Sequence, residues 1–324
     1  MITLSKIAKL ANVSVSTVSK AFSMSKEVNQ ETRELIFKIA KENHCFKKYY
    51  NAKYPKIVIA VISPEFDSSY YAKWLSEIQK YAGKYNWEIT VATTNLNPET
   101  EEKIIEYYTN YTEVDGIIII NRVSKIKEES EIPIISIGKG SIDKENMIIR
   151  FDYKSAYDKL FEILKERKIK KVGFIGDNYT KSKFNFVKDL IKENGLEYDD
   201  DLNGNVEKRF EIGGYEGMKK ILSSGKIPDA VICAYDSMAL GAMRCLKDKN
   251  IQVPEQVSVI GMDNIESGKY TVPSLSSIGF DIEFASKTAV DNLMNILNDK
   301  PYIKEAVIKS ELHVRESIIE KDEN

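Results

Sequence analysis

The feature that most constrains this chain is a pair of short helical patterns near its N-terminus. Residues 5–11 repeat apolar side chains at helical spacing, and residues 12–14 interrupt them with types that favour turns and caps. Ser14 can accept a hydrogen bond from the backbone N–H of Thr17 and so begin a second helix over residues 15–22. The apolar positions of the first pattern are Ile7, Ala8, Leu10 and Ala11. The stretch predicts two short helices joined by a tight turn.

The second helix is predicted to have one apolar face and one small, polar face. The inward residues are Val18, Ala21 and Phe22. The outward residues are Val15, Ser16, Ser19 and Lys20. Such a face fits the major groove of DNA, which is about 12 Å wide. There Lys20 can donate to guanine, Ser16 can contact a base edge, and Val15 can touch a thymine methyl group.

A third helix is expected over residues 30–42, with Asn29 as its N-cap. Its predicted buried stripe consists of Leu35, Ile36, Ile39 and Ala40. Two helices joined by a tight turn, with a third to complete the core, describe a helix-turn-helix. An ordinary three-helix packing module is the structural alternative. The small outward residues and the local charge favour DNA binding.

Charge is segregated along the chain. Residues 1–54 hold ten Lys and Arg against four Asp and Glu, a net of +6, whereas the remainder carries −8. A positive N-terminal module gains phosphate contacts and releases counterions, while the acidic remainder makes a poor DNA surface. The partner expected of the N-terminal module is therefore double-stranded DNA.

The N-terminal residues also resemble a known family. Thr3-Leu4, the run from Ile7 to Lys20, and Val28 to Arg33 closely resemble the N-terminus of lactose-repressor (LacI/GalR) family regulators. In that family the residues at the positions of Val15, Ser16 and Lys20 read the operator, so base contact is expected of these three. The full DNA-binding surface expected from the pattern and the resemblance is Thr3, Ser14, Val15, Ser16, Thr17, Ser19, Lys20 and Asn29.

Residues 45–56 are expected to form a hinge or linker, rich in Lys, Tyr and Asn. In the resembled family this segment carries a hinge helix that inserts a leucine into the minor groove. This sequence lacks the Pro-Asn after the first tyrosine and the Ala-Arg-…-Leu run of that family. An aromatic wedge formed by Phe46, Tyr49 or Tyr50 and a flexible tether are both left open.

From residue 57 the chain alternates apolar, strand-like runs with amphipathic helical patterns. Such units imply parallel sheets that are covered on both faces, and the strands are too many for one compact sheet. The predicted fold is an all-α helix-turn-helix head plus an α/β effector domain built as two parallel-sheet sandwich subdomains.

The expected ranges are 1–44 for the head, 45–56 for the linker and 57–324 for effector binding and dimerisation. By the resemblance, the last part is similar to a periplasmic sugar-binding protein. It is then divided into an N-subdomain at about 57–167 and 280–305 and a C-subdomain at about 168–279 and 306–320.

Ligands of open α/β sheets bind at the carboxyl ends of the strands, so the polar residues that follow predicted strands are candidates. These are Asp152, Tyr235, Asp236 and Asp263. By the resemblance, Asp263 and Asp152 match effector contacts. Capping of the helix from Ser155 is the structural alternative for Asp152, and capping of the helix from Met238 is the alternative for Asp236.

Further effector positions come from the resemblance. Lys183 stands where the family places an arginine, so a point charge replaces a planar fork. Tyr235 stands where asparagine is common among sugar-responsive members. The remaining positions are Ser69, Tyr70 and Tyr71, which match an aromatic loop after the first strand, and Phe210, which matches a stacking aromatic. Plain core packing is the alternative for these aromatic side chains.

No metal, cofactor or catalytic arrangement is expected. Cys45, Cys233 and Cys245 are odd in number and widely spaced, and only two histidines accompany them, so neither a disulfide framework nor a zinc site is expected. The sequence shows no phosphate loop and no Ser/His/Asp arrangement, which argues against an enzyme. Nothing resembles a secretion signal or a membrane span, which favours a cytoplasmic protein over an exported solute-binding protein.

The predicted function is that of a homodimeric transcriptional regulator that binds a near-palindromic operator. A repressor is favoured over an activator. A small metabolite between the two subdomains, with a sugar or sugar phosphate favoured, would control it. A regulator with a purine-type corepressor is the alternative.

Overall fold

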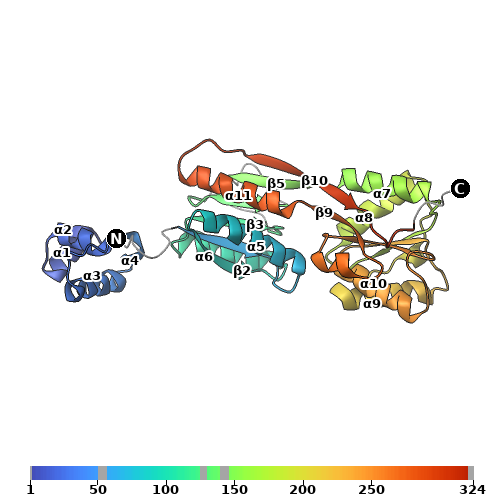
Figure 1. The fold of residues 1–324 in the computed structure, drawn as a ribbon, viewed down its shortest axis with the longest axis horizontal. Coiled ribbons are helices and arrows are strands. Elements are labelled where there is room, and N and C mark those ends of the chain that lie inside the picture. Colours follow the sequence, from blue (N-terminus) through green and yellow to red (C-terminus); the bar gives the residue numbers. More distant parts are fainter. Residues whose placement is uncertain (1, 50–56, 125–129, 139–145, 320–324) are drawn as a thin grey trace. The chain divides into compact units, whose positions relative to one another are not determined.

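The computed structural model describes residues 2–49, 57–124, 130–138 and 146–319. The chain in Figure 1 divides into two compact units. The first comprises Met1–Glu65, Leu75–Met147 and Lys287–Tyr302, and the second comprises Phe66–Trp74, Ile148–Ser286 and Ile303–Asn324. Each unit is therefore assembled from segments that lie far apart in the sequence.

The head consists of α1 (Leu4–Ala11), α2 (Val15–Phe22), α3 (Gln30–Glu42) and α4 (Phe46–Tyr49), drawn in blue in Figure 1. The ranges predicted for α2 and α3 are confirmed. The prediction that Leu35 is buried is wrong, because its side chain is 45% exposed. It lies about a quarter of a helical turn from the middle of the buried stripe of α3.

The core of the head continues past its expected end. Phe46 and Tyr49 of α4 both pack on that core. The ring centroids of Phe46 and Phe37 are 5.0 Å apart, and the Tyr49 hydroxyl donates to the backbone carbonyl of Ile2 at 3.1 Å. A minor-groove wedge made of Phe46 or Tyr49 therefore disagrees with this structure, since both rings help to build the head. Tyr50, the third candidate, lies outside the described residues.

The first unit contains a parallel sheet with the strand order β2-β1-β3-β4. Its strands are β1 (Val58–Ser63), β2 (Glu88–Thr93), β3 (Gly116–Ile120) and β4 (Ile134–Ile137). The helices are α6 (Pro98–Asn110) and parts of α5 (Ser69–Lys84) and α11 (Ile282–Leu297), both of which begin in the second unit. Strands β3 and β4 are buried throughout, as expected for continuous apolar runs.

The second unit contains a mixed sheet with the order β5-β10-β9-β8-β7-β6. Its strands are β5 (Met147–Asp152), β6 (Val172–Ile175), β7 (Ala230–Cys233), β8 (Ser258–Met262), β9 (Ser276–Phe280) and β10 (Glu305–His313). Strands β6 to β9 are parallel neighbours, whereas β10 runs parallel to β5 and antiparallel to β9. The purely parallel sheet that was predicted here is corrected by the β9–β10 pair.

Strands β9 and β10 lack the sequence signal of the other strands. Strand β9 begins with two serines, and β10 buries only alternate residues along half its length. Neither strand therefore shows the continuous apolar run by which the others were recognised.

The helices of the second unit are α7 (Lys154–Glu166), α8 (Lys181–Glu193), α9 (Phe210–Ser223) and α10 (Asp236–Asp248), with 3-10 turns at Asp200–Leu202 and Glu266–Tyr270. Helices α9 and α10 lie side by side in Figure 1. A Cβ on Gly214 would lie 1.9 Å from the carbonyl oxygen of Met238, and one on Gly241 would lie 1.9 Å from that of Glu211. The two glycines let the backbones of α9 and α10 approach each other this closely.

Candidate DNA interface and effector site

Three of the predicted DNA-binding residues cap the helices of the head. The side-chain oxygens of Thr3, Ser14 and Asn29 each accept a hydrogen bond from the backbone N–H three residues further along, at 3.3, 3.0 and 2.8 Å. The N-terminus of a helix presents backbone N–H groups that can bind a phosphate. Contacts of this kind position a protein on the duplex without reading its sequence.

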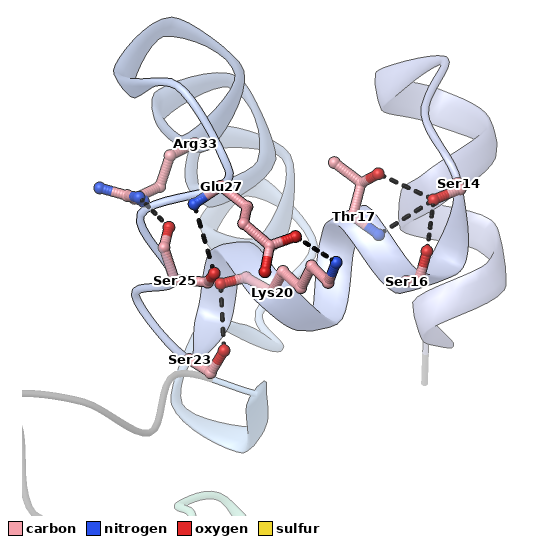
Figure 2. Close-up of polar contacts among 8 residues, drawn as sticks. All are labelled: Ser14, Ser16, Thr17, Lys20, Ser23, Ser25, Glu27 and Arg33. Atoms are coloured by element: carbon pink, nitrogen blue, oxygen red, sulfur yellow. Dashed lines mark hydrogen bonds and ion pairs between the residues drawn. The ribbon is translucent and has the colours of Figure 1, made fainter.

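The outward face of α2 carries the residues expected to read bases. Val15, Ser16, Ser19 and Lys20 are exposed, while Val18, Ala21 and Phe22 are buried. This confirms the two predicted faces. Ser14 lies at the start of this surface, with its hydroxyl oxygen 2.8 Å from those of both Ser16 and Thr17 (Figure 2). Hydroxyls, one apolar patch and one ammonium are the groups that pair with base edges in the major groove.

Lys20 has an acidic neighbour that the sequence analysis did not single out. Its Nζ lies 2.5 Å from the carboxylate of Glu27, in the loop between α2 and α3 (Figure 2). Both side chains are exposed, at 48% and 68%. An exposed pair of this type contributes little to the stability of the head.

In the second unit, the residues that follow strands β6, β7 and β8 gather at one edge of the sheet. Asp177 follows β6, Tyr235 follows β7, and Asp263 follows β8. Because these strands are parallel neighbours, their carboxyl ends lie at the same edge. This is the edge at which an open α/β sheet binds its ligand.

Strand β10 brings two further strand ends together. Consecutive residues of β10 pair with Asp152 at the end of β5 and with Phe280 at the end of β9. The rings of Phe151 and Phe280 consequently lie 4.3 Å apart between centroids, and Tyr153 meets Phe280 edge-on at 4.8 Å. These rings form an aromatic wall that the sequence analysis missed, because the pairing that aligns them joins distant segments.

The first turn of α5 extends this wall. The segment from Ser69 to Tyr71 was predicted as a loop but is helical, because its aromatic positions continue the buried stripe of the helix. The ring centroid of Tyr70 lies 5.2 Å from that of Tyr71 and 6.3 Å from that of Trp74. The ring centroid of Trp74 lies in turn 5.9 Å from that of Phe151. The rings are thus connected one to the next. Ser69 itself is exposed at the start of the helix.

Asp263 and Lys183 are the charged pair beside these rings. Burial raises the pKa of Asp263 to about 7, and the positive charge of Lys183 opposes that rise. Burial also lowers the pKa of Lys183, whose Nζ donates to the carbonyl of Ala234 at 2.9 Å and lies 5.0 Å from the Tyr235 ring centroid. The pKa of Tyr70 is raised, first by burial and in part by the charge of Asp263, which connects the pair to the aromatic wall.

Arg209 is a site residue that the sequence analysis missed. Its Nε donates to the buried carboxylate of Asp177 at 3.2 Å. Its guanidinium carbon lies 4.6 Å from the ring centroid of Phe210 and 5.6 Å from that of Tyr235. The site therefore has a planar arginine fork, on a different element from Lys183. No spacing pattern connects Arg209 with Asp177, since the two are far apart in the sequence; the only available signal was its position next to Phe210.

The carboxylate of Asp236 is engaged inside the protein. One oxygen accepts from the Ser277 hydroxyl at 2.6 Å and the other from the backbone N–H of Ile265 at 2.7 Å. Its pKa is raised to about 8, first by burial and then by the charge of Asp263. Asp236 therefore holds the segment after β8, and with it Asp263, in place. Helix α10 has no side-chain cap, so the capping alternative for Asp236 is wrong. An effector contact by Asp236 stays a prediction.

Asp152 lies just before α7, and its Oδ1 accepts a hydrogen bond from the backbone N–H of Lys154 at 2.9 Å. The N-cap residue of that helix is Tyr153, and it makes no side-chain cap bond. An effector contact by Asp152 stays a prediction.

Within residues 2–49, 57–124, 130–138 and 146–319, no three His, Cys, Asp or Glu side chains are grouped so that they could hold a metal ion. No helix of those ranges combines the length and the apolar character of a membrane span. The three cysteines are buried as free thiols.

Two families match the chain. The family described as "Bacterial regulatory proteins, lacI family" matches residues 3–44, and the "Periplasmic binding protein-like domain" matches residues 161–318.

Similar proteins of known function are transcriptional regulators. The chain is 27% identical to the HTH-type transcriptional regulator IdnR of Escherichia coli, over 86% of each chain. It is 27% identical to the HTH-type transcriptional repressor PurR of Pasteurella multocida, over 98% of this chain and 99% of that one. It is 25% identical to catabolite control protein A of Staphylococcus aureus, over 86% of this chain and 87% of that one.

Solved structures agree on the fold. The lac repressor dimer bound to operator and the anti-inducer ONPF superposes with a TM-score of 0.71 at 18% identity, over 98% of this chain and 99% of that one. A complex of the transcriptional regulator CelR with cellobiose superposes with a TM-score of 0.68 at 21% identity, over 98% of this chain and all of that one. The chain therefore combines a DNA-binding domain like that of the lacI family of bacterial regulatory proteins with a periplasmic-binding-protein-like effector domain, and it is a DNA-binding transcriptional regulator.

Proposed function

We propose that this regulator is a cytoplasmic homodimeric repressor whose effector is a neutral sugar. The observation that carries the effector class is the aromatic wall at the carboxyl edge of the second unit, with acidic and basic groups balanced beside it. Aromatic faces pack against the C–H surface of a sugar, while carboxylate, ammonium and guanidinium groups exchange hydrogen bonds with its hydroxyls.

The charge balance favours a neutral sugar over a sugar phosphate. Arg209 is paired with Asp177, and the charge of Lys183 acts on the pKa of Asp263. A phosphate would have to displace Asp177 from Arg209, whereas a neutral hydroxyl can share both partners.

A purine is the second candidate effector. The relative PurR of Pasteurella multocida is a repressor with this name, and the rings of Tyr70, Phe151 and Phe280 offer flat faces on which a base can stack. In that case the ligand would strengthen DNA binding as a corepressor.

The effector class is tested by thermal unfolding of the full chain with neutral mono- and disaccharides, sugar phosphates, hypoxanthine and guanine. A ligand at 100 times its Kd stabilises the folded state by about 2.7 kcal/mol, so binding appears as a raised Tm. We expect the neutral sugars to raise Tm and Asp263→Ala to abolish the shift. A shift with purines alone would replace the sugar assignment, and a full shift in Asp263→Ala would move the site elsewhere.

Control of DNA binding is proposed to follow from two states of the dimer. A ligand shifts such an equilibrium only by its different affinity for the two states. Paired recognition helices have to lie about 34–36 Å apart to enter successive major grooves, so a small change in their spacing is enough to break operator binding. The measurement is operator affinity with and without the hit from the thermal screen. For a repressor released by an inducer we expect affinity to fall by about 5- to 150-fold.

A further inference from the structure

The side of the head that faces DNA carries an acidic side chain beside its reading lysine. Glu27 is 68% exposed, and Figure 2 shows it extended toward Lys20, with 2.5 Å between Oε2 and Nζ. DNA carries a dense negative charge, so an exposed carboxylate at this place weakens binding to any duplex.

The loop that carries Glu27 is held at both ends. The backbone N–H of Ser25 donates to the carbonyl of Lys20 at 3.0 Å, which ties the loop to the last turn of α2. From α3, Arg33 donates to the carbonyl of Ser25 at 2.7 Å (Figure 2). It also donates to the carbonyl of Val28 at 2.8 Å. Glu27 lies between these two anchored carbonyls, so its position beside Lys20 follows from the loop.

We propose that Glu27 is a specificity-determining residue of the head, a role that rests on the DNA-binding function. It orients the Lys20 ammonium on the outward face of α2. An ammonium has three donors, so Lys20 can keep its bond to Glu27 and still donate to a guanine edge. The same pairing keeps Lys20 from acting as a free cation toward phosphates.

Glu27 is expected to affect binding to the operator and binding to unrelated DNA differently. Binding to unrelated DNA depends almost wholly on phosphate contacts, whereas binding to the operator adds base contacts. The carboxylate therefore weakens non-specific binding more than operator binding. Glu27 lowers the affinity for all DNA, and it raises the ratio of operator affinity to affinity for unrelated DNA.

The test compares the full chain with its Glu27→Gln variant on two duplexes. One is the duplex that the wild-type protein enriches from a randomised pool, and the other is a scrambled version of it. For the scrambled duplex we expect binding to tighten by up to about eightfold at 0.1 M salt and the log–log salt slope to steepen by about one, as for one added phosphate contact. For the enriched duplex we expect a smaller change, so that the specificity ratio falls.

Two controls separate this role from a simple loss of charge. Glu34→Gln removes a charge of the same sign from the exposed surface of α3, and we expect the specificity ratio to stay the same. In a Lys20→Ala background, Glu27→Gln should no longer lower the ratio. The proposal would be overturned if Glu27→Gln tightened binding to both duplexes equally. It would also be overturned if Glu27→Gln lowered the specificity ratio as much in the Lys20→Ala background as in the wild type. A wild-type chain that enriches no duplex would instead overturn the DNA-binding assignment.

Discussion

Side chains of the head divide between folding and recognition. Thr3, Ser14 and Asn29 use their side-chain oxygens as helix caps, whereas Lys20 stands exposed on the outward face of α2. A change at a cap therefore acts first on the stability of the head, and a change at Lys20 acts first on DNA binding.

Lys20→Ala should weaken operator binding and relax the preference at one base pair. A lysine contact to guanine accounts for about 1–3 kcal/mol of discrimination, which is lost with the ammonium. Fluorescence anisotropy with the enriched duplex and its single-base variants measures both effects. Lys38→Ala on α3 removes the same charge and should leave the base preference intact. An unchanged preference in Lys20→Ala would remove this residue from the reading face.

Asp263→Asn should change how stability depends on pH. The folded-state pKa of Asp263 is about 7, against an ordinary value of 3.8, so the folded chain binds more protons than the unfolded chain between those values. Wild-type stability therefore falls as the pH rises from about 4 to 7, and asparagine, which does not titrate, escapes that fall. Relative to wild type, the free energy of unfolding of the variant should rise by up to about 1.4 kcal/mol for each pH unit in this window. Above the window the difference should stay constant.

Thermal unfolding of the full chain at pH 5, 6, 7 and 8 checks this difference. Asp189→Asn, at an exposed position on α8, serves as the matched control and should follow wild type. A gap between Asp263→Asn and wild type that is the same at every pH would contradict a buried, titrating carboxyl.

At the scale of elements, helices α9 and α10 determine where the charged part of the effector site stands. Arg209 immediately precedes α9, and Tyr235 immediately precedes α10. The contact of the two helices at Gly214 and Gly241 leaves no room for a side chain. The positions of the arginine fork and of the tyrosine ring therefore depend on the two glycines at which the helices meet.

Gly214→Ala should be strongly destabilising. The added methyl would sit 1.9 Å from a backbone carbonyl oxygen, so the helices have to separate, and overpacking of this kind costs about 1–3 kcal/mol or more. Gly83→Ala in α5 is the control, because its added Cβ meets nothing within 4 Å. There the better helix propensity of alanine should stabilise the chain by up to about 1 kcal/mol. We expect Gly214→Ala to lower Tm and Gly83→Ala to raise it. An unchanged Tm for Gly214→Ala would show that the two helices can move apart freely.

At the scale of the whole molecule, two heads have to act on one operator. A single short recognition helix makes too few base contacts for tight specific binding, which is why a homodimer and a near-palindromic site were proposed. The required spacing of the heads follows from the repeat of the DNA.

Insertion of five base pairs between the half-sites of the enriched duplex should therefore weaken binding. Half a helical turn places the second half-site on the opposite side of the DNA, so one head loses its base contacts. We expect at least a tenfold loss in a gel-shift titration of the full chain. A duplex with a neutral substitution at the same centre serves as control, and equal affinity for both would contradict paired heads.

The sequence by itself determined the helix-turn-helix and most of the strand–helix units. Both are local patterns: the caps at Ser14 and Asn29 and the faces of α2 follow from spacing within one helix. Buried parallel strands likewise appear as apolar runs. The end of a predicted strand indicated Asp263, and the resemblance added Lys183. The structure brings the two close enough to shift each other's pKa.

Only the tertiary structure decided the rest of the effector site. The aromatic wall depends on β10, which aligns the ends of β5 and β9, and β10 joins segments more than 100 residues apart. The Arg209–Asp177 pair and the inward bonds of Asp236 likewise connect residues with no common spacing. Short-range periodicity determines elements, whereas contacts between distant segments depend on how those elements pack, and no local pattern in the chain records that packing.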